Sequence, residues 1–217
     1  SLEKFHILDD NLIQDALISI HSYPYGITYD GQYLWIGNRY GDIYAYTLEG
    51  VSTGNTFQSP VSDENAPTFD GDYFILNDWN AYNPTIYRVD HSGNIIESFT
   101  FIDNSYIQQA VWVEAHNDGH LWVNLTIGTI AQLSLANGTA EIIQEFTSPN
   151  STVASSISHN GRDLWYGYST VLYQIDDGID ERNWLATDII SGTIAEGSSK
   201  DIQVTFDATG LFGGDYS

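Results

Sequence analysis

The chain repeats one short pattern, and this repeat is the feature that most limits its possible folds. Residues 26–37 read Gly-Ile-Thr-Tyr-Asp-Gly-Gln-Tyr-Leu-Trp-Ile-Gly, and residues 66–77 match them in identity or character at nine of twelve positions. Looser copies occupy residues 113–124 and 156–167. The central glycines are 40, 48 and 42 residues apart, at Gly31, Gly71, Gly119 and Gly161. A period of this length is typical of folds that stack one supersecondary unit.

Each copy predicts a tight β-hairpin. An alternating apolar run leads into an Asp-Gly or Asn-Gly turn, and a second run follows that carries Leu-Trp or its equivalent. A third run follows in every copy, at residues 42–46, 85–89, 129–133 and 171–175. A fourth is clearest at residues 94–99 and 141–146. Four strands in about 40 to 45 residues make one propeller blade, so we predict an all-β chain that forms a β-propeller.

The two ends of the repeat region predict how the ring closes. Residues 1–8 match the fourth-strand pattern of residues 96–102, whereas the last copy, at residues 156–176, supplies only three strands. We therefore expect four blades, with the N-terminal strand completing the last one. The alternative is that the chain is part of a larger propeller with further blades upstream.

The repeat resembles a known group of propellers. Its Asp-Gly-x-Tyr-Leu-Trp-Ile-Gly core, with an Ile-Tyr-x-x-Asp strand after it, is similar to the NHL and YVTN repeats of secreted bacterial and archaeal proteins, over residues 1 to about 176. The resemblance implies a propeller over residues 1–180 and an extracellular or cell-surface location.

The remaining segment, residues 181–217, resembles the first half of an immunoglobulin-like module of surface proteins. A Trp-Leu strand, a Ser-Gly-Thr turn, a Val-Thr-Phe-Asp strand and a Gly-x-Tyr-Ser start follow in order from Trp184. Such sandwiches need about seven strands and roughly 100 residues, so this segment is only a partial β-sandwich. We expect it either to pack on the propeller flank or to be completed by strands of a neighbouring chain, which would allow self-association into a filament.

Charge and composition exclude several classes of function. Six basic against 29 acidic residues give a net charge of −23, which repels nucleic acid and anionic membranes. No apolar run approaches the length of a membrane span. Without cysteine the chain has neither disulfides nor a thiolate site. We predict no cofactor; calcium is the alternative, with Asp176, Asp177 and Asp180 as weak candidate ligands.

The loops that follow the second and fourth strands of each blade are rich in aromatic and polar residues. Flat rings beside amide and carboxylate groups suit a carbohydrate or a protein ligand. The candidate ligand-binding residues are Arg39, Tyr40, Asp78, Trp79, Tyr82 and Tyr106. The recurring tryptophans Trp35, Trp122 and Trp165 are instead expected to pack between blades.

We find no nucleophile motif, phosphate loop or metalloprotease motif in the sequence. The prediction is therefore a non-catalytic extracellular binding or scaffolding module of adhesive type. One alternative is a carbohydrate-active enzyme or lyase that uses Asp78 or Glu114 with His116 in the funnel of the propeller. Another is a structural filament subunit.

Overall fold

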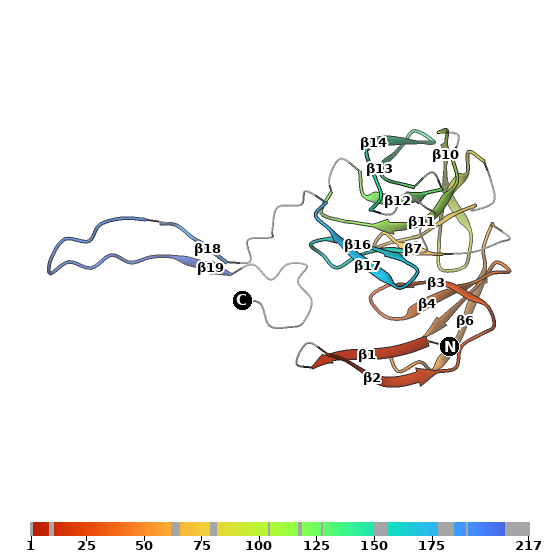
Figure 1. The fold of residues 1–217 in the computed structure, drawn as a ribbon, viewed down its shortest axis with the longest axis horizontal. Helices are drawn as coiled ribbons and strands as arrows, with labels where there is room; N and C mark the ends of the chain where they lie inside the picture. Colours follow the sequence, from red (N-terminus) through yellow and green to blue (C-terminus); the bar gives the residue numbers. More distant parts are fainter. Residues whose placement is uncertain are drawn as a thin grey trace.

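The computed structural model describes residues 2–8, 11–61, 66–78, 82–103, 105–116, 119–126, 128–149, 156–177, 185–189 and 191–206. Within these ranges every regular element is a β-strand, and the blades gather around a common centre (Figure 1). The all-β prediction is confirmed. The described residues contain no helix that is long and apolar enough to cross a membrane.

Four groups of consecutive antiparallel strands correspond to the four sequence copies. The first comprises β3 (Pro24–Tyr29), β4 (Leu34–Asn38), β5 (Asp42–Tyr46) and β6 (Ser52–Gln58). The second comprises β7 (Thr68–Phe69), β8 (Phe74–Asn77), β9 (Thr85–Val89) and β10 (Ile95–Phe101). The third comprises β11 (Ile107–Trp112), β12 (Leu121–Leu125), β13 (Thr129–Ala136) and β14 (Thr139–Thr147), and the last comprises β15 (Ser156–His159), β16 (Leu164–Tyr168) and β17 (Val171–Ile175). We call these groups blades 1 to 4.

The hairpin turns form where the Asp-Gly and Asn-Gly pairs predict them. Asp30 Oδ1 accepts hydrogen bonds from the backbone N–H groups two and three residues ahead, at 2.7 and 2.6 Å, and Asp70 and Asn160 do the same. The following Gly31 has φ +93°, a left-handed conformation that glycine adopts without strain. Each turn is thus specified by two adjacent residues.

Three seams of buried side chains hold neighbouring blades together. Trp35 and Ile43 of blade 1 pack with Phe74 and Leu76 of blade 2. The other face of blade 2, including Ile75 and Ile86, packs against Leu121, Val123 and Leu125 of blade 3. The opposite face of blade 3 packs on Ile157, Leu164 and Tyr166 of blade 4. Because side chains alternate along a strand, each inner blade contributes to two seams.

The tryptophans at the repeated position do not all behave alike. Trp35 is 3% exposed and Trp122 is fully buried, as predicted. Trp165 is only half-buried, and its neighbour Tyr166 takes the place in the seam. The difference follows from position, because the face of blade 4 that carries Trp165 has no further described blade against it.

The first strands of successive blades lie side by side, β3 with β7, β7 with β11 and β11 with β15. Blades 2 and 3 are also joined at their outer strands, where β10 pairs in parallel with β14 through Thr100 and Phe101. Among the described strands there is no comparable contact between β15 and β3.

The N-terminal strand does not close the ring, and that prediction was wrong. β1 (Leu2–Leu8) pairs antiparallel with β2 (Asn11–Ile18), while β17 pairs only with β16 among the described strands. The physical reason is the length of the loop that must close. A partner that begins three residues further on costs far less chain entropy than one more than 150 residues away.

The C-terminal segment forms a two-stranded hairpin of β18 (Leu185–Thr187) and β19 (Val204–Phe206). Figure 1 shows this hairpin extending away from the blades and not packed on the propeller flank, the first of the two expected arrangements. Its apolar side chains lie in solvent, with Ile194 57%, Ile202 51% and Phe206 69% exposed.

Candidate functional site

The blades have two ends with different side chains. We call the end that carries the β4–β5 and β8–β9 connections the loop end, and the end that carries the β3–β4, β11–β12 and β9–β10 turns the turn end. The sequence placed the candidate site at the loop end.

At the loop end each predicted tyrosine is paired with another tyrosine. Tyr82 meets Tyr106 edge to face with ring centroids 5.6 Å apart. Tyr40 meets Tyr23 in the same way at 5.5 Å. Tyr23, Tyr40 and Tyr82 are 63%, 60% and 55% exposed, so both pairs present large aromatic surface to solvent.

The other predicted residues lie near these pairs in the chain. Arg39 is exposed in the β4–β5 turn, and its backbone N–H donates to the carbonyl of Tyr23 at 3.0 Å. Asp78 is half-buried directly after β8. Trp79 lies outside the described residues.

The turn end of the seam between blades 1 and 2 carries a carboxylate beside an imidazole. Asp30 Oδ2 accepts the indole N–H of Trp35 at 2.6 Å and lies 3.3 Å from His91 Nε2. Burial raises the pKa of Asp30, but hydrogen bonds from Tyr33, Trp35 and Gln32 outweigh it and hold the pKa below 3.8. Asp30 is therefore ionised at neutral pH.

The seam between blades 3 and 4 carries a similar group, more deeply buried. Asp177 Oδ2 lies 3.1 Å from His116 Nε2 and 2.9 Å from His159 Nε2, and the Asp177 side chain has no exposed surface. His159 Nδ1 accepts the backbone N–H of Gly161 at 3.0 Å, so the proton of the neutral ring lies on Nε2 and is donated to Asp177. Burial lowers the pKa of His159 below 6.5 despite the attraction of Asp177.

Of the weak calcium candidates, the structure describes Asp176 and Asp177. Asp177 is held by the two imidazoles, Asp176 is exposed beside it, and Asp180 lies outside the described residues. Within the described ranges no group of three or more His, Asp or Glu side chains could hold a metal ion.

The residues considered for catalysis have other partners or lie at different ends of the blades. His116 contacts Asp177, and Glu114 Oε2 accepts the indole N–H of Trp112 at 2.9 Å. Asp78 follows β8 at the loop end, whereas His116 lies in the β11–β12 turn at the turn end. Asp78 and His116 therefore do not form a dyad.

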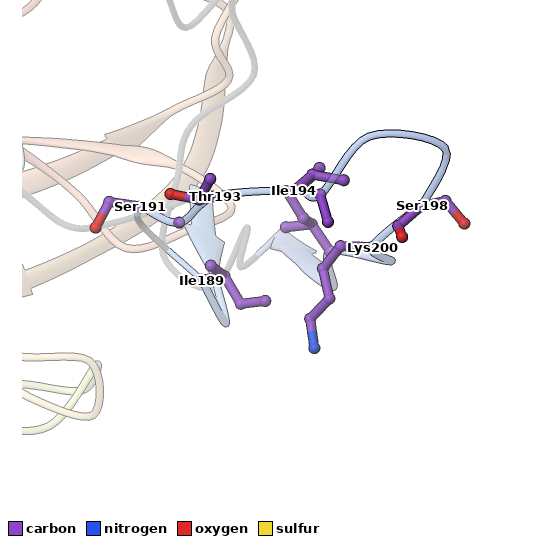
Figure 2. A pocket seen from close by; sticks show the side chains of 10 residues that line it. Ile189, Ser191, Thr193, Ile194, Ser198 and Lys200 are labelled. Atoms are coloured by element: carbon purple, nitrogen blue, oxygen red, sulfur yellow. The ribbon is translucent and has the colours of Figure 1, made fainter.

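A polar cavity of about 530 Å³ opens at the turn end of the seam between blades 1 and 2, beside Asp30 and His91. A second cavity of similar volume lies between the arms of the β18–β19 hairpin (Figure 2). There Ile189, Ile194 and Lys200 come from a single two-stranded ribbon, as the labelled sticks show.

Known structures resemble the chain in fold, although no family and no curated protein matches its sequence. The WD40 propeller domain of Doa1 aligns with a TM-score of 0.51 and 16% identity, over 76% of this chain and 54% of that domain's chain. The Cps50 (Swd1) propeller domain of Myceliophteria thermophila aligns with a TM-score of 0.50 and 12% identity, over 70% and 51%. A Bacteroides caccae protein of unknown function gives 0.50 and 11%, over 72% and 58%.

The chain has a β-propeller fold. It spans little more than half the length of these solved chains. At such low identity the likeness concerns the fold alone.

Some residues of this propeller escaped the sequence-based prediction. Tyr23 completes the pair with Tyr40, and its φ of +57° is a conformation that no sequence pattern signals for tyrosine. The contacts Asp30–His91 and His116–Asp177 each join residues 61 apart. The only signal that could have found them is the recurrence of Asp and His at the ends of strands.

Proposed function

We propose that this propeller is a four-bladed, non-catalytic, extracellular binding or scaffolding module whose loop end binds a protein partner. The observation that carries the proposal is the two exposed edge-to-face tyrosine pairs at that end. Tyrosine gives large contact area with few rotatable bonds, and it is enriched in protein-binding surfaces. The alternative ligand, a carbohydrate, would use the same rings.

The electrostatic character of the chain supports this choice of partner. A net charge of −23 favours a partner with a basic surface and raises its rate of association at low salt. The exposed Arg39 directly precedes Tyr40 in the chain and gives the site one local cation.

The test uses the whole chain on an array of purified extracellular proteins and glycans. We expect wild type to bind at least one protein, and the double variant Tyr40→Ala/Tyr82→Ala to bind it at least about tenfold more weakly, as for the loss of aromatic anchors. Tyr29→Ala is the matched control, because Tyr29 is 43% exposed at the turn end. Equal binding by the double variant and wild type would contradict the proposal, and binding to glycans alone would favour the carbohydrate alternative.

A second candidate function is self-association through the C-terminal hairpin. An isolated two-stranded ribbon is at best marginally stable in water, and this one exposes Ile194, Ile202, Val204 and Phe206. Strands from a neighbouring chain would cover these side chains and make the protein a filament subunit. Light scattering would test this, since the expected rise in mass with concentration should disappear in Val204→Lys.

A further inference from the structure

The polar cavity at the turn end is built from three separate segments of two blades. The β3–β4 turn supplies Gln32 and Tyr33, β6 supplies Asn55, and the β9–β10 turn supplies His91 and Ser92. Its volume of about 530 Å³ lies within the usual range for small-molecule sites. A site between blades is therefore present at the end opposite the tyrosine pairs.

The floor of the cavity is held by satisfied hydrogen bonds. Asp30 uses one carboxylate oxygen for two backbone N–H groups and the other for Trp35 and His91. The His91 ring also makes T-shaped contacts with Trp35, Phe69 and Phe74, with centroids 4.9 to 5.7 Å apart. A floor fixed in this way is preorganised for binding.

The rim, in contrast, carries unused hydrogen-bonding groups. Among the described residues the Asn55 amide, the Ser92 hydroxyl and the second ring nitrogen of His91 have no hydrogen-bond partner. Gln32 Nε2 donates to the Tyr33 hydroxyl at 3.0 Å, which places an amide beside a half-buried aromatic ring. These groups include both donors and acceptors.

The charges of the cavity select against ions. Asp30 is the only acidic lining residue, and no Lys or Arg lines the described cavity. An anionic ligand would meet the Asp30 carboxylate and a strongly negative protein. A cation would find both Asp30 oxygens already accepting hydrogen bonds. A neutral ligand with many hydroxyl groups fits the remaining chemistry.

We infer that this cavity binds one or two sugar units of a neutral glycan. Asn55, Ser92 and His91 bind vicinal hydroxyls, and the faces of Tyr33 and His91 contact the apolar face of the sugar ring. The inference is independent of the proposed protein partner, because the two sites lie at opposite ends of the blades.

The test is calorimetric titration of the full chain with four neutral disaccharides: maltose, cellobiose, lactose and chitobiose. We expect at least one to bind wild type, and Asn55→Ala and His91→Ala each to weaken that binding at least about tenfold. Ser98→Ala is the matched control, because Ser98 is likewise an exposed polar residue of an outer strand. Thermal melts of each variant confirm that the fold is kept.

Two results would overturn the inference. One is that none of the four disaccharides binds wild type. The other is that binding persists in Asn55→Ala and His91→Ala, or is lost instead in Tyr40→Ala/Tyr82→Ala, which would place the sugar at the loop end. Loss of protein binding at the loop end with retained sugar binding would leave this site intact, so the two proposals fail separately.

Discussion

The seam between blades 1 and 2 and the seam between blades 3 and 4 each join an aspartate and a histidine of neighbouring blades, with the two residue types exchanged. Each joins a residue of the first turn of one blade to the second residue after the third strand of the next, 61 residues away. In the first seam the turn supplies Asp30 and the strand end supplies His91. In the other the turn supplies His116 and the strand end supplies Asp177.

The exchange of aspartate and histidine distinguishes an open seam from a buried one. The Asp30 carboxylate accepts hydrogen bonds from the backbone of its own turn and from the Trp35 indole. The His91 side chain is 48% exposed beside an open cavity. His116 leaves the indole N–H of Trp122 without a hydrogen-bond partner within the described part of the chain, and Asp177 is enclosed by two imidazoles. One arrangement makes a polar opening, and the other makes a buried joint.

The largest expected difference comes from truncating the residue after the third strand in each seam. Asp177→Ala leaves two half-buried or buried imidazoles without their acceptor, and should lower the free energy of unfolding by about 3 kcal/mol. His91→Ala removes a ring that is 48% exposed, and should cost about 1 kcal/mol. Urea unfolding of both variants measures the difference, and equal losses would show that the two seams are energetically alike.

Local signals explain which parts of the fold were predictable. The hairpin turns at Gly31 and Gly71 depend on adjacent residues, so their sequence specifies them. Tyr40 and Tyr82 at the loop end were also predictable, because loops after the second strand of a blade share one end. Strand partners depend instead on chain entropy and on competing edges. The pattern of residues 2–8 identified a strand but not β2 as its partner.

The candidate sites also divide into residues that local sequence predicts and contacts that depend on the packing of the blades. Tyr40 and Tyr82 were named from their loops, whereas the Asp30–His91 contact needs the packing of two blades to be known. The carboxylate–imidazole contacts also exchange their residue types between seams, so the repeat pattern does not reveal them. A repeat shows which backbone positions are equivalent, but not which side chains meet across a seam.

An intermediate effect is expected from the two equivalent tryptophans. Trp35→Phe removes an indole N–H that Asp30 accepts at 2.6 Å, whereas Trp122→Phe removes one that has no partner in the described structure. Both changes remove similar volume from a buried seam. Trp35→Phe should therefore lower the free energy of unfolding by about 1 kcal/mol more than Trp122→Phe. If Trp122→Phe proves the more costly, its indole must have a partner and the contrast between the seams fails.

The smallest effect is the dependence of stability on pH in the seam between blades 3 and 4. The pKa of folded His159 is below its ordinary 6.5, so the unfolded chain binds this proton more readily than the folded chain. The contribution of His159 to stability is thus complete above pH 6.5 and falls as the pH is lowered towards its folded pKa. Asp177, His116 and Asp163 are the charged or titratable groups that act on it.

Urea unfolding between pH 7.5 and 5.5 should show this loss of stability, and His159→Gln should reduce it. His91→Gln at the open seam, where the ring is 48% exposed, is the matched control for the loss of a histidine. If His159→Gln leaves the slope unchanged, burial does not disfavour the protonated ring. The attraction of the neighbouring Asp177 carboxylate would then outweigh the effect of burial.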